Sequence, residues 1–161
     1  CREAQELVHL GILDGHNVLY LDKVEPDRTI RVWSRVGRQV SVLTTALGRA
    51  MIAAEGAADT LLSAYTAEAD PLVADRFARS VAEARVHGYA TEREENEAGI
   101  CCVGVALRRP TGRPVAVSIT GPTSRMGADR LDKLGTRLRE MLSVSAPPGF
   151  SVVSTDPAGD P

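Results

Sequence analysis

The order of the predicted elements indicates an α+β protein, in which helices pack on an antiparallel sheet. Extended runs follow each other through short turns: "ICCVGVALRR" (100–109) and "PVAVSITGP" (114–122) are separated only by a turn around Gly112. Strands joined so directly pair antiparallel, because a parallel pair needs a long crossover. Segments with helical apolar spacing lie before, between and after the extended runs, and they supply the helices that cover the sheet.

The first half of the chain is predicted to contain a helix, a hairpin and a second helix. Four apolar residues within 2–10 have roughly helical spacing, so a short helix is expected there, ended by Gly11. "HNVLYLDKVE" (16–25) and "TIRVWSRV" (29–36) are extended runs on either side of a turn, which predicts a hairpin. The alanine-rich stretch 44–56 predicts a helix that Thr44 or Thr45 caps.

The second half carries clearer helix signals. Asp70 can cap a helix, Pro71 suits its first position and Gly88 ends it, while 128–143 has leucines at helical spacing. The complete predicted order is one helix, two strands, two or three helices, three strands and a final helix. Residues 1–145 are expected to form one domain, followed by a flexible Pro/Gly/Ser-rich tail over 146–161.

Composition excludes several classes of function. No run approaches the ~20 apolar residues of a membrane span, so no membrane partner is expected. The 19 basic and 21 acidic residues give no basic excess for gripping phosphates, so this chain should not itself bind DNA. Cys1, Cys101 and Cys102 suggest neither a disulfide framework nor a metal site, which favours a cytoplasmic setting without metal or cofactor. The chain opens at Cys1 without an initiator methionine, so a preceding segment is expected.

Alternation along the two late strands predicts a pocket. Cys101 shares one strand face with bulky side chains, while Cys102 and Gly104 lie on the opposite, small face. Ser118 and Thr120 lie on the small face of the next strand. The bulky faces should meet helices, and two adjacent small faces would leave a concavity with a thiol and hydroxyls, suited to a small molecule. The alternative is an ordinary strand whose Ser118 and Thr120 face solvent.

Other polar residues have simpler interpretations. The acidic run 92–97 is typical of a solvated loop, from which one carboxylate can turn inward. His9, His16 and His87 fall at predicted element ends, where capping or solvent exposure is expected rather than metal ligation. The start of the alanine-rich helix offers free backbone N–H groups, which are a natural anchor for a carboxylate.

Three segments together resemble the C-terminal effector-binding domain of the IclR family of bacterial transcription regulators. "GRQVSVLTTALGRAMIA" is similar to that family's glycine, proline-leucine-histidine and "TALGKA" helix start. "HGYATEREENEAGICCVGVAL" is similar to its "GYA-D-EE---G--C-A-P" signature, and "GRPVAVSITGPTSRM" to its "G---AALSISGP--R" strand. The resemblance covers nearly the whole chain. It implies a GAF/profilin-like fold with about six antiparallel strands, a preceding winged helix-turn-helix that binds DNA, and a homodimer or homotetramer.

The resemblance also implies an effector pocket. The backbone of the helix start (Ala46 and Leu47), the acid Glu92, the thiol of Cys102 and the hydroxyls of Ser118 and Thr120 supply its polar groups. Leu43 and Ile100 form its apolar wall, with Trp33, Val36 and Val42 as further neighbours. Ser41-Val42-Leu43 replaces the family's proline-leucine-histidine, Glu92 replaces an aspartate, and Thr120 replaces a serine. We therefore expect a tighter, more apolar pocket. Its effector would be an organic acid or aromatic carboxylate, anchored at Ala46 and Leu47, with an apolar body against Leu43 and Ile100.

Two functions follow from these residues. The first is a non-enzymatic sensor domain, in which effector binding shifts a conformational equilibrium and alters operator affinity. The second is an enzyme with Cys102 as nucleophile and Glu92 as acid/base. The second lacks a histidine partner, because no histidine is expected in the segments that form the pocket.

Overall fold

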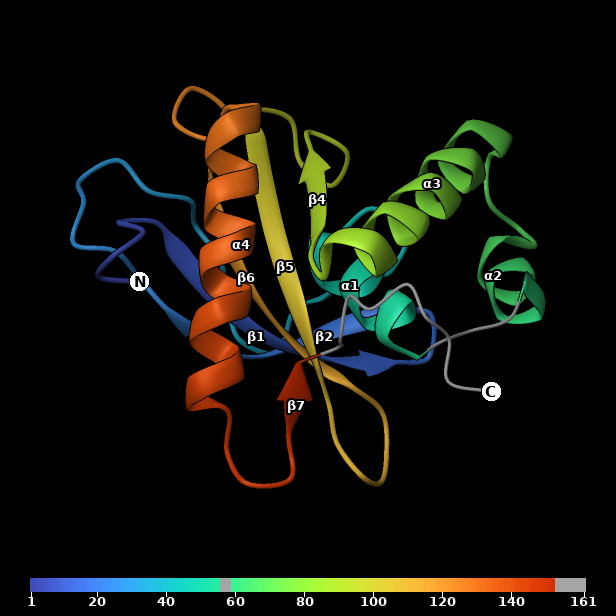
Figure 1. Ribbon diagram of the computed structural model, residues 1–161. Coiled ribbons are helices and arrows are strands. Elements are labelled where there is room, and N and C mark those ends of the chain that lie inside the picture. The colour runs from blue at the N-terminus through green and yellow to red at the C-terminus, as the bar shows by residue number, and fades with distance from the viewer. Residues whose placement is uncertain (56–58, 153–161) are drawn as a thin grey trace.

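The computed structural model describes residues 1–55 and 59–152, and it has the predicted α+β architecture. The sheet order is β3-β2-β1-β6-β5-β4, all pairs are antiparallel, and β7 pairs with the end of β5 (Figure 1). The strands are β1 (Leu7–Asp14), β2 (Asn17–Val24), β3 (Gln39–Ser41), β4 (Ala90–Arg93), β5 (Ile100–Arg108), β6 (Val115–Pro122) and β7 (Ser151–Val152). The helices are α1 (Ala46–Ala54), α2 (Asp59–Thr66), α3 (Pro71–His87) and α4 (Ala128–Ser145).

Helices lie on both faces of the sheet. α4 runs along β5 (Figure 1), and its Leu131 and Leu138 share a buried cluster with Cys101 and Val103. The bulky face of β5 therefore meets a helix, and Cys101 points into the core, as alternation predicts. A second cluster joins α1 and α3 to the other face, where Ala106 is buried.

Gly104 allows α1 to approach the sheet closely. A Cβ at this position would lie 2.9 Å from the carbonyl oxygen of Ala46 and 3.2 Å from the backbone nitrogen of Leu47. The first turn of α1 therefore lies directly on β5. The sequence placed Gly104 in the floor of a concavity, but the room that it leaves is taken by α1.

The predicted helix ends and the second hairpin are confirmed. Thr45 caps α1 by accepting the Gly48 N–H at 3.2 Å. Asp70 caps α3, and Gly88 ends it with a φ of 77°. β5 and β6 pair directly, and Gly112 in their connection has a φ of 86°.

Two predictions for the first half are wrong. Residues 2–10 do not form a helix, because β1 begins at Leu7 and hydrogen-bonds to β2 on one side and β6 on the other. Pairing along both edges outweighs the helical spacing of four apolar residues. The hairpin partner of β2 is β1, through a turn with Gly15 at a φ of 60°. Residues 29–36 contain no strand, and Ile30 and Trp33 are 74% and 73% exposed.

The stretch predicted as a tail includes β7. Its Ser151 and Val152 pair with Arg108 and Leu107, which attaches these two residues to the sheet. The rest of the predicted tail, residues 153–161, lies outside the described residues. No helix among the described residues has the length and hydropathy needed to cross a bilayer.

Candidate functional site

One face of the sheet brings polar side chains from four strands together. Directly opposed residues of antiparallel strands share a face. The strand register aligns Glu92 with Cys102 and Cys102 with Thr120, while Ser118 in the adjacent row opposes His9 of β1. Four of the predicted site residues therefore lie on one face, together with a histidine that the sequence did not place there.

The N-terminus of α1 borders this face. The contact between Gly104 and Ala46 puts the first helical turn over β5, next to Cys102. Ala46 and Leu47 are buried, and no acceptor for their backbone N–H groups is found in residues 1–55 and 59–152. An anion at this point would accept hydrogen bonds from these groups and be stabilised by the helix dipole.

Glu92 is the buried acid of the site, with an exposed fraction of 2%. Its Oε1 accepts hydrogen bonds from the backbone N–H groups of Glu95 at 2.6 Å and Asn96 at 3.2 Å. Burial raises the pKa of Glu92, although these two hydrogen bonds oppose the shift. The Cys102 thiol is close to the carboxylate, but no group reaches Oε2 with hydrogen-bond geometry in the described part of the chain. A donor on a ligand would satisfy this oxygen.

Arg49 clamps the loop after β4, residues 94–99, to α1. Its buried guanidinium bonds both carboxylate oxygens of Glu95, at 2.9 and 2.6 Å, and donates to the carbonyls of Leu43 and Thr91. The clamp fixes the backbone N–H groups that hold Glu92. Arg49 and Glu95 were not predictable from the sequence, because only the fold brings residues 46 positions apart into contact.

His9 is the third residue of β1, paired on both sides, and is 3% exposed, so its expected place at an element end is wrong. The ring stacks on Tyr20 with centroids 4.3 Å apart, and Nε2 lies 2.7 Å from the hydroxyl of Ser34. Nδ1 is buried without a hydrogen-bond partner within the described chain. Burial, assisted by the positive charges of Lys23 and Arg38, lowers the pKa of His9 to about 4. The imidazole is therefore neutral at pH 7.

Cys102 is a protonated thiol in the floor of the site. The Thr120 hydroxyl donates to its sulfur at 3.3 Å. Burial raises the pKa of Cys102 well above its usual value, and the neighbouring Glu92 carboxylate raises it further. The thiolate, which is the reactive form of cysteine, is therefore disfavoured here.

The apolar residues of the predicted pocket lie in different places. Ile100 is half-buried and opposes Pro122 at the end of β5, on the face that carries Cys102. Leu43 lines a separate hollow of about 540 Å³ with His16 and Tyr65.

The three further predicted neighbours differ in burial. Trp33 and Val36 are 73% and 45% exposed, and Val42 is fully buried in the core beneath α1.

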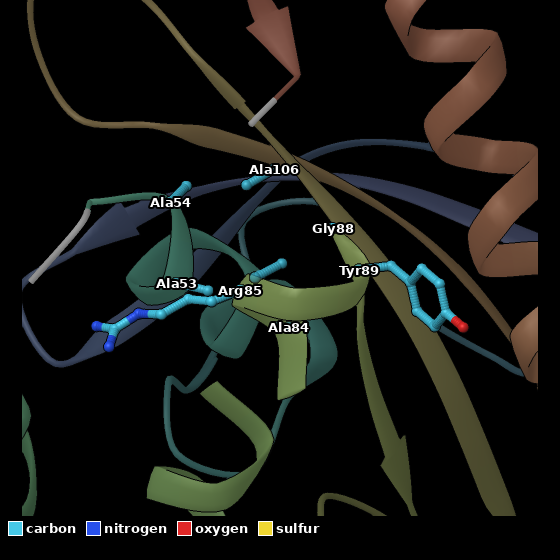
Figure 2. Close-up of a pocket in the computed structure, with 8 residues that line it drawn as sticks. Ala53, Ala54, Ala84, Arg85, Gly88, Tyr89 and Ala106 are labelled. Atoms are coloured by element: carbon cyan, nitrogen blue, oxygen red, sulfur yellow. The ribbon is translucent and has the colours of Figure 1, made fainter. Parts of the chain in front are cut away.

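A small cavity lies where the ends of α1 and α3 meet β5. Figure 2 shows its lining, which includes Ala53, Ala54, Ala84 and Ala106. Its volume of about 10 Å³ is room for roughly one water molecule, so it holds no metabolite. No group of three or more His, Cys, Asp or Glu side chains in residues 1–55 and 59–152 could hold a metal ion.

Comparisons with known proteins give a consistent family. The family model described as "Bacterial transcriptional regulator IclR C-terminal" matches residues 1–145. The HTH-type transcriptional regulator XynR of Escherichia coli (strain K12) is 34% identical over 157 residues, covering 92% of this chain and 62% of that protein. The HTH-type transcriptional regulator Rv1719 of Mycobacterium tuberculosis is 35% identical over 150 residues, covering 90% of this chain and 58% of that protein.

Solved structures agree with this result. The Thermotoga maritima IclR matches with a TM-score of 0.73 and 31% identity, covering 86% of this chain and 59% of that one. An IclR-family regulator of Brucella abortus matches with a TM-score of 0.79 over 90% of this chain and 58% of that one, and its 22% identity supports the fold alone. The chain spans about three fifths of the length of these relatives.

Proposed function

This chain belongs to the IclR family of bacterial transcriptional regulators, as a C-terminal domain, and on that premise we propose that it binds a small organic acid and thereby controls DNA binding by the whole regulator. DNA contact would fall to a helix-turn-helix domain of the same regulator, which would act in the cytoplasm. The observation that carries the proposal is the buried Oε2 of Glu92, which lacks a partner within the described chain. Leaving such an acceptor unsatisfied costs about 1–3 kcal/mol, which a ligand donor would offset.

The surrounding groups suit an acid. The open N–H groups of Ala46 and Leu47 would hold its carboxylate, and the hydroxyls of Ser118 and Thr120 lie on the floor between them and β1. An aromatic body is less well supported than the sequence suggested, because Leu43 lines another hollow and leaves Ile100 as the apolar wall.

A thermal-shift series tests the proposal. An organic acid at 100 times its Kd should stabilise the domain by about 2.7 kcal/mol and raise the Tm by several degrees. Glu92→Ala should abolish the shift. Tyr65→Ala, in the hollow lined by Leu43, is the matched control and should preserve it. The reverse pattern would place the effector in that hollow and contradict the proposal.

Control of DNA binding is tested in the whole regulator. A coupling of about 1–3 kcal/mol would change operator affinity roughly 5- to 150-fold. Fluorescence anisotropy with labelled operator, with and without the acid, measures this change. An unchanged affinity at saturating acid would contradict the regulatory role.

We propose that the pocket binds its ligand without converting it. A Cys102 nucleophile would need a thiolate beside a protonated histidine, whereas the pKa of Cys102 is raised and that of His9 is lowered to about 4. Cys102→Ser should therefore retain acid binding, and incubation of the wild type with the acid should leave the acid unchanged by NMR. Conversion of the acid that depends on Cys102 would favour the enzyme.

We further propose a homodimer or homotetramer. Val24 and Leu21 of β2 are 54% and 42% exposed, and apolar surface of this kind is often covered by a subunit. Light scattering should give two or four times the chain mass of 17.2 kDa. A monomer at micromolar concentration would contradict this part of the proposal.

A further inference from the structure

We propose that His9 contacts the effector directly, and that the effector is a hydroxylated carboxylic acid rather than an acid with an apolar body. This inference rests on the proposed function, because it concerns the same pocket. It starts from a second buried polar atom on the pocket face, Nδ1 of His9, which has no partner within the described chain.

His9 and Glu92 lie on the outer two of four adjacent strands, on one face of the sheet. β6 and β5 separate β1 from β4, and the row of Glu92 meets β1 at Leu7, two residues before His9, so three strand spacings and this offset place the Cα atoms of the two residues roughly 16 Å apart. Both residues lie on the face that carries Cys102, Ser118 and Thr120. A ligand that bonds both side chains would therefore have to span the two strands between them.

The His9 ring is held in one orientation. Tyr20 stacks on its face, and Ser34 bonds its Nε2 edge at 2.7 Å. These contacts occupy every polar position of the ring except Nδ1. A polar atom held so firmly and left unpaired is uncommon in proteins, and fixed supporting contacts of this kind are typical of residues that select a ligand.

The charges at the pocket ends favour hydroxyl groups. The neutral imidazole offers one hydrogen bond at Nδ1, and Oε2 of Glu92 accepts another. A second carboxylate on the ligand would meet the Glu92 carboxylate, which cannot donate when ionised. Hydroxyls would satisfy both atoms while the ligand carboxylate lies at Ala46 and Leu47. An acid without hydroxyls would leave both atoms unpaired.

Matched pairs of acids test the ligand class. Glycerate and propionate share three carbons and a carboxylate and differ by two hydroxyls, and gluconate and hexanoate form a longer pair. A site built around hydroxyl contacts should bind the hydroxylated member of at least one pair more than about tenfold tighter by calorimetry. Equal binding within both pairs would overturn the inference.

Two variants of His9 test the contact. An asparagine side chain reaches the position of Nδ1, and a glutamine side chain reaches that of Nε2. His9→Asn should retain the preference for the hydroxylated acid, whereas His9→Gln should keep the bond to Ser34 and lose most of the preference. If both variants fail to fold, ¹⁵N NMR of the wild-type imidazole gives the answer: Nδ1 should shift with the hydroxylated acid and not with its partner. An unmoved Nδ1 signal would refute the contact.

The two proposals fail in different ways. If acids bind without regard to hydroxyls and Glu92→Ala abolishes binding, this inference is wrong and the proposed function stands. If no acid of either pair binds, and the wider acid series gives no shift that depends on Glu92, the proposed function falls together with this inference.

Discussion

The buried imidazole of His9 makes the stability of the domain depend on pH. Its pKa falls from 6.5 in the unfolded chain to about 4 in the folded one. Between these values the unfolded chain binds a proton that the folded chain does not, so acid favours unfolding. The stabilisation is complete above pH 6.5 and is lost toward pH 4, a difference of about 3 kcal/mol. Denaturation of the wild type and His9→Gln at pH 7 and 4 measures it. Between pH 7 and pH 4, the free energy of unfolding should fall by about 3 kcal/mol more in the wild type than in the variant. An equal fall in the two proteins would contradict this account.

Glu92 has the opposite pH dependence. Burial raises its pKa in the folded state. Its contribution to the stability of the domain is therefore present below the unfolded pKa of 4.5 and is lost as the pH rises through the folded pKa. Glu92→Gln removes this loss, and the glutamine oxygen can still accept from the Glu95 and Asn96 N–H groups. The variant should be more stable than the wild type at pH 7, and this advantage should disappear near pH 4. Glu95→Gln, which weakens the pair with Arg49, should instead destabilise at pH 7.

The sequence could reveal only those pocket residues that belong to a local pattern. Cys102, Ser118 and Thr120 were placed on one side of their strands by alternation, and the structure has them on that side. His9 was missed because its strand was taken for a helix. Its hydrogen bond to Ser34 joins residues 25 positions apart, and no local pattern carries such a contact.

At the scale of elements, the contact between α1 and β5 sets the position of the open N–H groups. A methyl group at Gly104 would lie 2.9 Å from the Ala46 carbonyl oxygen, and neither backbone can move easily. Gly104→Ala should cost about 1–3 kcal/mol and shift the start of α1. Denaturation and amide exchange of Gly48 would measure both effects. Gly127→Ala is the control, because nothing lies within 4 Å of its Cβ position and its φ is −61°. Equal stability of the two variants would contradict the close approach.

The ion pair of Arg49 with Glu95 is a second contact between elements, and it holds the 94–99 loop against α1. Arg49 is 1% exposed and Glu95 17%, so removing the guanidinium leaves a partly buried carboxylate and two carbonyls without their donor. Arg49→Met should cost about 3 kcal/mol and speed amide exchange at Asn96. Arg79→Met removes an exposed pair with Asp75 and should cost less than about 0.5 kcal/mol. Similar losses in the two variants would show that burial does not matter at this pair.

Elements with strong end signals were predictable, and those fixed by pairing were not. α3 has a cap, a proline and a terminal glycine within its own sequence, and its predicted bounds hold. β1 has no such signal in residues 2–10, and it becomes a strand because β2 and β6 pair with it. The dipeptide Asp14-Gly15 is a hairpin signal at the turn between β1 and β2. It was not used, because a helix was expected at 2–10 and the hairpin turn was expected at 26–28.

At the scale of the whole molecule, four arginines hold the first residues of the chain against the domain. Arg125 bonds both carboxylate oxygens of Glu6, at 2.6 and 2.7 Å, and Glu6 is 1% exposed. Three more side chains bond residues 3–5, namely Arg28, Arg130 and Arg137. Under the proposed function, this segment would connect the sensor to the DNA-binding domain.

The loop between β2 and β3, residues 25–38, joins the pocket to this first segment. Its Ser34 bonds His9 at 2.7 Å, and its Arg28 donates to the Gln5 carbonyl at 2.8 Å. The Ile30 carbonyl accepts from the same Arg125 that binds Glu6. A ligand that fixes His9 would therefore act, through one loop, on the segment that leaves the domain. The coupling along this route is measurable.

Arg125→Met tests that coupling. In the wild type, an acid that raises the Tm through Glu92 should slow amide exchange at Gln5 and Glu6, because the ordered loop holds Arg125 against Glu6. In Arg125→Met the acid should still bind, but the slowing should be lost. Arg137→Met is the matched control: its pair with Glu3 is more than half exposed, so the effect of the acid should persist. If the acid slowed exchange equally in all three proteins, the signal would pass to the first segment by another route, and the loop would serve only to close the pocket.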